Sequence, residues 1–148
     1  MRAVSNTPGP QRQRGAGLLE VLIAVLVLSV GLLGLASLQL NALRFNNSAF
    51  LRSQATILAY DIADRMRANR PVALAGDYNL ALAATPPTAT TVVATDLQEW
   101  RGQLAARLPA GTGAIDVSTV DSVAVIRVVW DDTRGVGAAT EFVFRTRL

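Results

Sequence analysis

The chain has 148 residues, of which 51% are hydrophobic, 17% charged and 5% aromatic, and this composition excludes an intrinsically disordered protein. All 14 basic residues are arginine, and three of them, Arg2, Arg12 and Arg14, lie at the N-terminus. The other arginines balance the 11 acidic residues, so the net charge of +3 belongs to the N-terminal segment and no nucleic-acid partner is expected. The absence of Cys and His excludes disulfides, thiolate metal ligands and the commonest general base.

The first two segments are typical of a membrane anchor. Residues 1–15 are basic and rich in turn-forming residues, so they indicate an unstructured leader. Residues 16–38 contain one charged residue, Glu20, and are long enough as a helix to cross a bilayer, which takes about 20 residues. The arginines ahead of this span predict a cytoplasmic N-terminus. A carboxylate at the bilayer centre costs about 2.5 to 3.5 kcal/mol, so Glu20 requires a partner.

The helix is expected to continue beyond the membrane to residue 70, because residues 39–70 contain no Pro or Gly and Pro71 follows. Leu43, Phe50 and Ile57 recur every seven residues, and we expect this stripe to form the core face of the helix rather than a coiled-coil seam. The neighbouring ridges carry Leu51, Leu58, Ile62 and Met66. The spacing of Asp61 with Arg65, and of Asp64 with Arg67, predicts ion pairs on the exposed face.

Residues 71–148 predict a small head. Residues 71–94 indicate a loop with a turn at Gly76-Asp77. Asp96 and Glu99 have the spacing of a capping box, which predicts a short helix from Asp96 to Leu108. Three strands are expected at residues 114–118, 122–130 and 140–148, with a hairpin turn at 131–137. The predicted fold class is therefore α+β: a long N-terminal helix whose second half covers an antiparallel sheet.

The remaining candidate sites favour structural roles. Four aspartates of the head could gather a calcium ion, but we expect them to be solvated, because no Asp-x-Asp-x-Asp loop is present; they are Asp116, Asp121, Asp131 and Asp132. Trp100 and Trp130 are expected in the core. Gly31 and Gly34 are either hinges or places of close helix packing. No residue pattern indicates catalysis, a metal or a cofactor.

Residues 14–23 resemble the class III signal of type IV prepilins; they read RGAGLLEVLI. Residues 27–36 and 58–69 resemble the PilV group of minor pilins, also called type IV pilus modification proteins; they read VLSVGLLGLA and LAYDIADRMRAN. The resemblance implies that prepilin peptidase cleaves between Gly15 and Ala16 and that Ala16 becomes N-methylated. It also implies that Glu20, then the fifth residue, meets the N-terminus of a neighbouring subunit. The chain departs from the family in having Ala16 where Phe is usual and in lacking the head disulfide.

The resemblance implies a minor pilin that initiates or caps a type IV pilus and so serves pilus biogenesis, twitching motility or adhesion. The expected partners are other minor pilins, the major pilin and prepilin peptidase. The expected location is the inner membrane, crossed once with the head in the periplasm, and then the pilus or its tip. Two alternatives stay open: a minor pseudopilin of a type II secretion system, and a single-span binding module.

Overall fold

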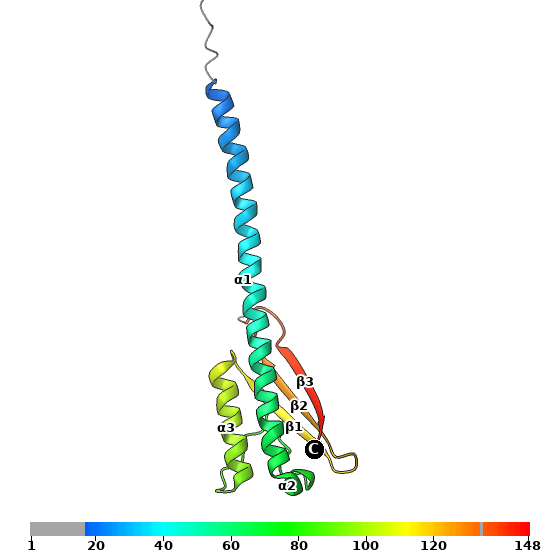
Figure 1. Cartoon of the computed structure of the whole chain (residues 1–148). Helices are drawn as coiled ribbons and strands as arrows, with labels where there is room; N and C mark the ends of the chain where they lie inside the picture. The colour runs from blue at the N-terminus through cyan, green and yellow to red at the C-terminus, as the bar shows by residue number, and fades with distance from the viewer. Residues whose placement is uncertain (1–16, 134) are drawn as a thin grey trace, which may run out of the picture. The chain divides into compact units, whose positions relative to one another are not determined.

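A computed structural model describes residues 17–133 and 135–148 of the chain (Figure 1). It confirms the α+β class, with a long N-terminal helix, two shorter helices and a three-stranded antiparallel sheet. The helices are α1 (Leu18–Ala68), α2 (Arg70–Leu74) and α3 (Val92–Arg107), and the strands are β1 (Thr112–Ser118), β2 (Val123–Trp130) and β3 (Thr140–Arg147). The chain divides into two compact units, one up to Leu43 and the other from Arg44 to Leu148. The second unit contains the predicted head of residues 71–148 together with the second half of α1, and from here on we call this whole unit the head.

The end of α1 differs slightly from the expected boundary at residue 70. The helix ends at Ala68, Asn69 leaves the helical conformation with φ −116° and ψ 43°, and α2 begins at Arg70. Pro71 therefore lies in the first turn of α2, where its missing N–H costs no hydrogen bond. The proline separates two helices, and the predicted loop begins with a short helix. The predicted turn at Gly76-Asp77 is confirmed, and Gly76 has the positive φ of 90° that such a turn favours.

The core of the head lies between α1, α3 and the sheet. One face of α1 is buried, and its members are Leu51, Ala55, Leu58, Ala59, Ile62, Ala63 and Met66. Both tryptophans are in this core, as predicted, and the Trp100 indole donates to the Leu58 carbonyl oxygen at 3.0 Å. Figure 1 shows α3 beside α1 on the side away from β3. The two helices therefore cover the sheet together.

The predicted core stripe of α1 is wrong. Phe50 and Ile57 are 58% and 54% exposed, and Leu43 is exposed as well. The buried face consists of the neighbouring ridge, which includes Leu58, and small alanines such as Ala55 and Ala59. The alanines let the helix approach the sheet and α3 closely, and a count of large apolar side chains gives them no weight. The stripe of Leu43, Phe50 and Ile57 is thus an exposed apolar ridge.

The sheet has the order β1-β2-β3, and both pairs are antiparallel. The predicted alternation of β2 is confirmed: its inner face is buried, and Arg127 on the outer face is exposed. The buried residues of β2 are Ala124, Ile126, Val128 and Trp130. Phe142 and Phe144 of β3 also point inward and are partly buried, and the Phe144 ring lies 4.5 Å from that of Tyr60 on α1. The hairpin expected at 131–137 joins β2 and β3, and the described part of it supports that prediction.

The predicted capping box is also wrong, because α3 begins four residues before Asp96. Thr91 is the N-cap residue, and its hydroxyl accepts a hydrogen bond from the Ala94 amide at 3.2 Å. The β-branched run before Asp96 favours extended structure, but Ala94 is buried and Val93 packs against the core. Tertiary packing therefore adds a first turn that local preference does not predict.

Candidate functional site

The N-terminal segment of α1 is the first candidate functional region. Gly17 precedes the helix, and its carbonyl oxygen accepts from the amide of Glu20 at 2.8 Å. Glu20 is exposed in the first turn, and every residue from Leu18 to Asn46 is exposed. Among the described residues, α1 is the one helix long and apolar enough to cross a membrane. A large exposed apolar surface is unfavourable in water, so this segment is suited to contact lipid or the helices of other subunits.

The glycines of this segment do not break the helix. α1 is continuous through Gly31 and Gly34, and a side-chain carbon added at either position would meet nothing within 4 Å. The Ser29 hydroxyl donates to the Val25 carbonyl oxygen at 2.7 Å, so this polar side chain is satisfied within the helix. The close-packing and hinge interpretations of the two glycines both remain open.

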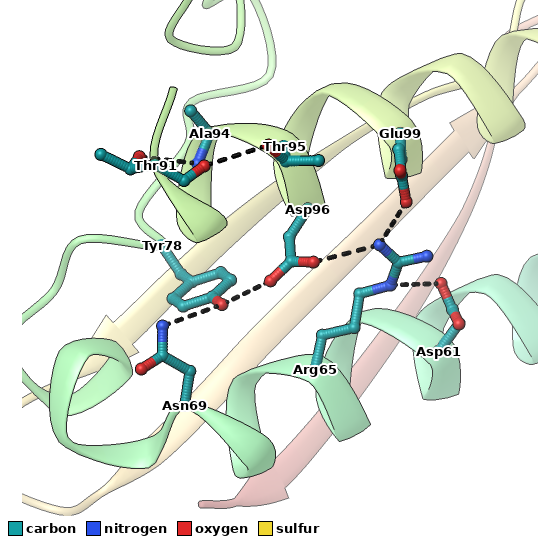
Figure 2. Close-up of polar contacts among 9 residues, drawn as sticks. All are labelled: Asp61, Arg65, Asn69, Tyr78, Thr91, Ala94, Thr95, Asp96 and Glu99. Atoms are coloured by element: carbon teal, nitrogen blue, oxygen red, sulfur yellow. Dashed lines mark hydrogen bonds and ion pairs between the residues drawn. The ribbon is translucent and has the colours of Figure 1, made fainter. Parts of the chain in front are cut away.

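A polar cluster joins α1 to α3 inside the head (Figure 2). The Arg65 guanidinium contacts three carboxylates: Asp61 at 3.1 Å, Asp96 at 3.1 Å and Glu99 at 2.7 Å. These contacts raise the pKa of Arg65, chiefly through the hydrogen bond with Glu99, so its charge is permanent. The pair with Asp61 confirms the prediction, whereas the two carboxylates from the supposed capping box instead bind a helix far away in the sequence.

The predicted pair of Asp64 and Arg67 is also confirmed, at 2.6 Å, and it lies on the exposed surface. Such a pair contributes little to stability, because water screens it.

Tyr78 extends this cluster into the core. Its hydroxyl donates to the second carboxylate oxygen of Asp96 at 2.6 Å and accepts from the Asn69 amide at 3.4 Å. The whole residue is buried. Burial, reinforced by the hydrogen bond to Asp96, raises the pKa of Tyr78 to about 12. Asp96 therefore links the turn after α2, α3 and α1, which is a structural role.

Arg101 holds the segment that leads into α3. One guanidinium nitrogen donates to the carbonyl oxygens of Ala81, Leu82 and Ala84 at 2.9, 3.0 and 3.1 Å, and the other donates to the Thr112 hydroxyl. Burial lowers the pKa of Arg101. This role escapes sequence reasoning, because the acceptors are backbone carbonyls, which every residue carries.

The four aspartates that could gather a calcium ion do not form one cluster. Asp121 lies in the turn between β1 and β2, where its carboxylate accepts from Ser118. Asp131 and Asp132 follow the opposite end of β2, and Asp132 accepts from the Ser48 hydroxyl of α1 at 2.5 Å. Among the described residues, no group of three or more carboxylates could hold a metal ion. The leader and both residues of the expected cleavage site, Gly15 and Ala16, lie outside the described residues.

Two family models match adjacent parts of the chain. Residues 10–36 match the prokaryotic N-terminal methylation motif, and residues 37–100 match the family described as type IV pilin Tt1218. No curated protein and no solved structure matches the chain. The methylation motif covers Glu20 and the apolar part of α1, and the pilin match covers the rest of α1 and the first half of α3. Over residues 10–100 the chain is therefore similar to type IV pilins, and its long helix with a small antiparallel sheet is a pilin-like arrangement.

Proposed function

We propose that the protein is a minor pilin of the PilV group that takes part in initiating or capping a type IV pilus. The observation that carries this proposal is the exposed apolar half of α1, whose one charged residue, Glu20, lies within the matched methylation motif. A helix of this kind functions by packing against other helices, because its apolar surface is exposed and is unfavourable in water.

The N-terminus is proposed to be processed between Gly15 and Ala16, and Ala16 is proposed to be N-methylated. Cleavage there removes the basic leader and creates a new N-terminal amine on Ala16, so that Glu20 becomes the fifth residue of the processed chain. The match to the methylation motif over residues 10–36 supports this site.

Glu20 is proposed to pair with the N-terminus of a neighbouring subunit. Within the described part of α1, no other ionisable residue lies between Leu18 and Leu43, so its countercharge must come from outside this segment. An amine and a carboxylate attract strongly in an apolar environment, where neither is well solvated. This pairing would set the axial position of each subunit relative to the next.

The location follows from the same segment. The precursor is proposed to cross the inner membrane once, with its N-terminus in the cytoplasm and its head in the periplasm, and then to enter the pilus or its tip. The other minor pilins and the major pilin are its proposed partners.

The deciding experiment is N-terminal sequencing and mass measurement of the protein from membranes of cells with and without active prepilin peptidase. We expect a chain beginning with N-methylated Ala16 in the first cells and Met1 in the second. A chain that begins at Met1 in both would overturn the proposal and leave a simple membrane anchor.

The role of Glu20 is tested with Glu20→Gln, which keeps the shape of the side chain and removes its charge. We expect normal cleavage and insertion but at least a tenfold loss from the sheared pilus fraction. Asp77→Asn is the matched control, since Asp77 is an exposed carboxylate of the head. Equal pilus recovery of both variants would contradict the assembly role.

The alternative of a minor pseudopilin predicts the same cleavage and the same effect of Glu20. The two functions differ in outcome: deletion of the gene should reduce surface pili for a minor pilin and protein secretion for a pseudopilin. A binding module would leave both unchanged.

A further inference from the structure

The loop between β2 and β3 carries an exposed apolar segment. It consists of Val136, Gly137, Ala138 and Ala139, all of them exposed, and we call these four residues the loop tip. Val136 is 90% exposed, so almost its whole side chain lies outside the core of the head. A single exposed valine is common on protein surfaces, so its meaning depends on what lies near it.

Hydrogen bonds within the loop hold the loop tip. The Asp131 carboxylate accepts from the amide and from the hydroxyl of Thr133, at 2.8 and 3.0 Å. The Thr133 hydroxyl accepts from the Gly137 amide at 2.8 Å, and the Thr133 carbonyl oxygen accepts from the Val136 amide at 3.4 Å. Because these two amides have partners, the loop tip can leave water without burying unpaired N–H groups there.

This loop lies at the end of the head where α1 enters it. Asp132 accepts from the hydroxyl of Ser48, whereas Thr146, near the other end of β3, accepts from Arg67 in the last turn of α1. β3 therefore starts near Ser48 and runs toward the end of α1 (Figure 1). The turn between β1 and β2 lies at the opposite end of the sheet, and its Val120 is also 90% exposed.

α1 carries an aromatic and a basic side chain at the same end of the head. Phe45 is 74% exposed, and Arg44 before it makes no ion pair within residues 17–133 and 135–148. Both directly follow the apolar segment that is proposed to cross the membrane. A ring next to a guanidinium suits the boundary of a bilayer, where the ring contacts acyl chains and the cation contacts phosphates.

The length of the helix places the loop within reach of that boundary. Ser48 lies ten residues after Leu38, the end of the predicted span, which corresponds to about 15 Å of helix. The headgroup layer fills about 6 Å of this length. Val136 lies four residues after Asp132, and four extended residues span up to about 13 Å, so the loop tip can reach the headgroups.

The size of the loop tip favours a lipid surface over a protein partner. A stable protein interface buries about 800 Å² on each side, from about 20 residues or more, and the loop tip has one valine and two alanines. A lipid surface requires no shape complementarity, so small apolar groups contribute to binding there by area alone.

We propose that the loop tip docks on the periplasmic headgroup layer of the membrane that α1 crosses. Val136 then lies among the lipid headgroups at the level of Phe45, and Arg44 contacts lipid phosphates. The inference rests on the proposed function, because a precursor that crosses the membrane once holds its head at this surface. The docked state ends when the subunit leaves the membrane, so it is compatible with a role in initiating or capping the pilus.

Quenching by spin-labelled lipids tests the docking, and no natural Cys interferes with labelling. Full-length Val136→Cys is labelled with an uncharged fluorophore and reconstituted in vesicles of phosphatidylethanolamine and phosphatidylglycerol. Lipids with a nitroxide close to the headgroup should quench this label at least about threefold more than the label on Val120→Cys. Val120 is the matched control, because it is also a valine in a turn and has the same exposure.

Two results at these positions would overturn the proposal. Equal quenching of Val136→Cys and Val120→Cys would mean that the loop tip has no preference for the lipid surface. A label at Val136→Cys that is shielded from iodide in water but is not quenched by the lipids would mean that protein covers the loop tip.

A charge added to the loop tip tests the apolar contact. In a chain labelled at Ala139→Cys, Val136→Asp should lower the quenching by the lipids at least about threefold, because a carboxylate stays in water. Val120→Asp adds the same charge at the opposite end of the sheet and should leave the quenching unchanged. Equal effects of the two substitutions would contradict an apolar contact.

A label within the apolar segment separates this inference from the proposed function. Leu28→Cys in the same vesicles should be quenched by nitroxides placed deep in the acyl chains. A quenched Leu28→Cys together with an unquenched Val136→Cys disproves the docking alone. An unquenched Leu28→Cys disproves the membrane-spanning precursor, and with it both the docking and the proposed location.

Discussion

The two halves of α1 have the same secondary structure and opposite surroundings. From Leu18 to Asn46 every residue is exposed, whereas Leu51 to Met66 bury one face against α3 and the sheet. In the first half the helix is stabilised by its backbone hydrogen bonds and by helix-forming side chains, and its apolar surface is exposed. The second half belongs to a core. Hydrophobicity alone therefore does not tell whether a helical residue stabilises this fold or serves assembly, and substitutions can separate the two.

The largest effect is expected at neighbouring residues of the second half. Leu58→Ala should lower the free energy of unfolding of the head by about 3 kcal/mol, because it opens a cavity in the core. Ile57→Ala should change it by less than about 0.5 kcal/mol. Denaturant unfolding of the full chain in detergent, followed by Trp fluorescence, measures both. Similar losses for the two would mean that the ridge belongs to the core after all.

A glycine pair compares the two halves of the molecule. Gly111→Ala should destabilise the head by about 2 kcal/mol, since an added carbon would lie 2.2 Å from the Leu104 carbonyl oxygen. Gly31→Ala meets nothing within 4 Å and should leave the unfolding of the head unchanged.

The pilus fraction of Gly31→Ala then distinguishes the two interpretations of this glycine. Unchanged incorporation would exclude a required hinge or a required close contact at this position, and a loss would support one of them. A destabilised head in this variant would contradict the separation into two units.

The polar cluster is expected to contribute less than the core. Asp96→Asn removes the charge that binds both Arg65 and Tyr78 and should cost about 1.5 kcal/mol. Asp64→Asn removes the exposed pair with Arg67 and should cost less than about 0.5 kcal/mol. Urea unfolding at neutral pH compares them. If the second change cost as much as the first, burial would not be the reason for the strength of the cluster.

The last expected effect is a dependence on alkaline pH. Because the pKa of Tyr78 rises from 10.0 to about 12 on folding, the folded state prefers the protonated phenol. This stabilisation is complete below pH 10 and is lost as the pH rises from 10 to about 12. The midpoint of thermal unfolding should therefore fall more steeply above pH 10 in the natural chain than in Tyr78→Phe. Tyr60→Phe is the control, and its midpoint should fall as steeply as that of the natural chain. A less steep fall in Tyr60→Phe would mean that Tyr78 is not the cause of the pH dependence.

Much of the fold could be predicted because its signals are local. The alternation of β2, the pairing of Asp61 with Arg65 and the apolar span after Gly17 each arise from spacing along the chain. The start of α3 could not be predicted, because the hydroxyl of Thr91 caps a turn that packing stabilises. The hydrogen bonds of Arg101 could not be predicted either, since its acceptors are backbone carbonyls distant in sequence.

The sequence by itself determined the long helix, the strands, the placement of Glu20 in an apolar segment and the resemblance to prepilins, because periodicity and charge are written along the chain. Only the tertiary structure decided which side of α1 enters the core. The approach of α1 to the sheet and α3 is set by small residues such as Ala55 and Ala59, so the larger Phe50 and Ile57 are left outside. Packing selects the face that fits the sheet and α3, and the ridge of Phe50 and Ile57 remains exposed.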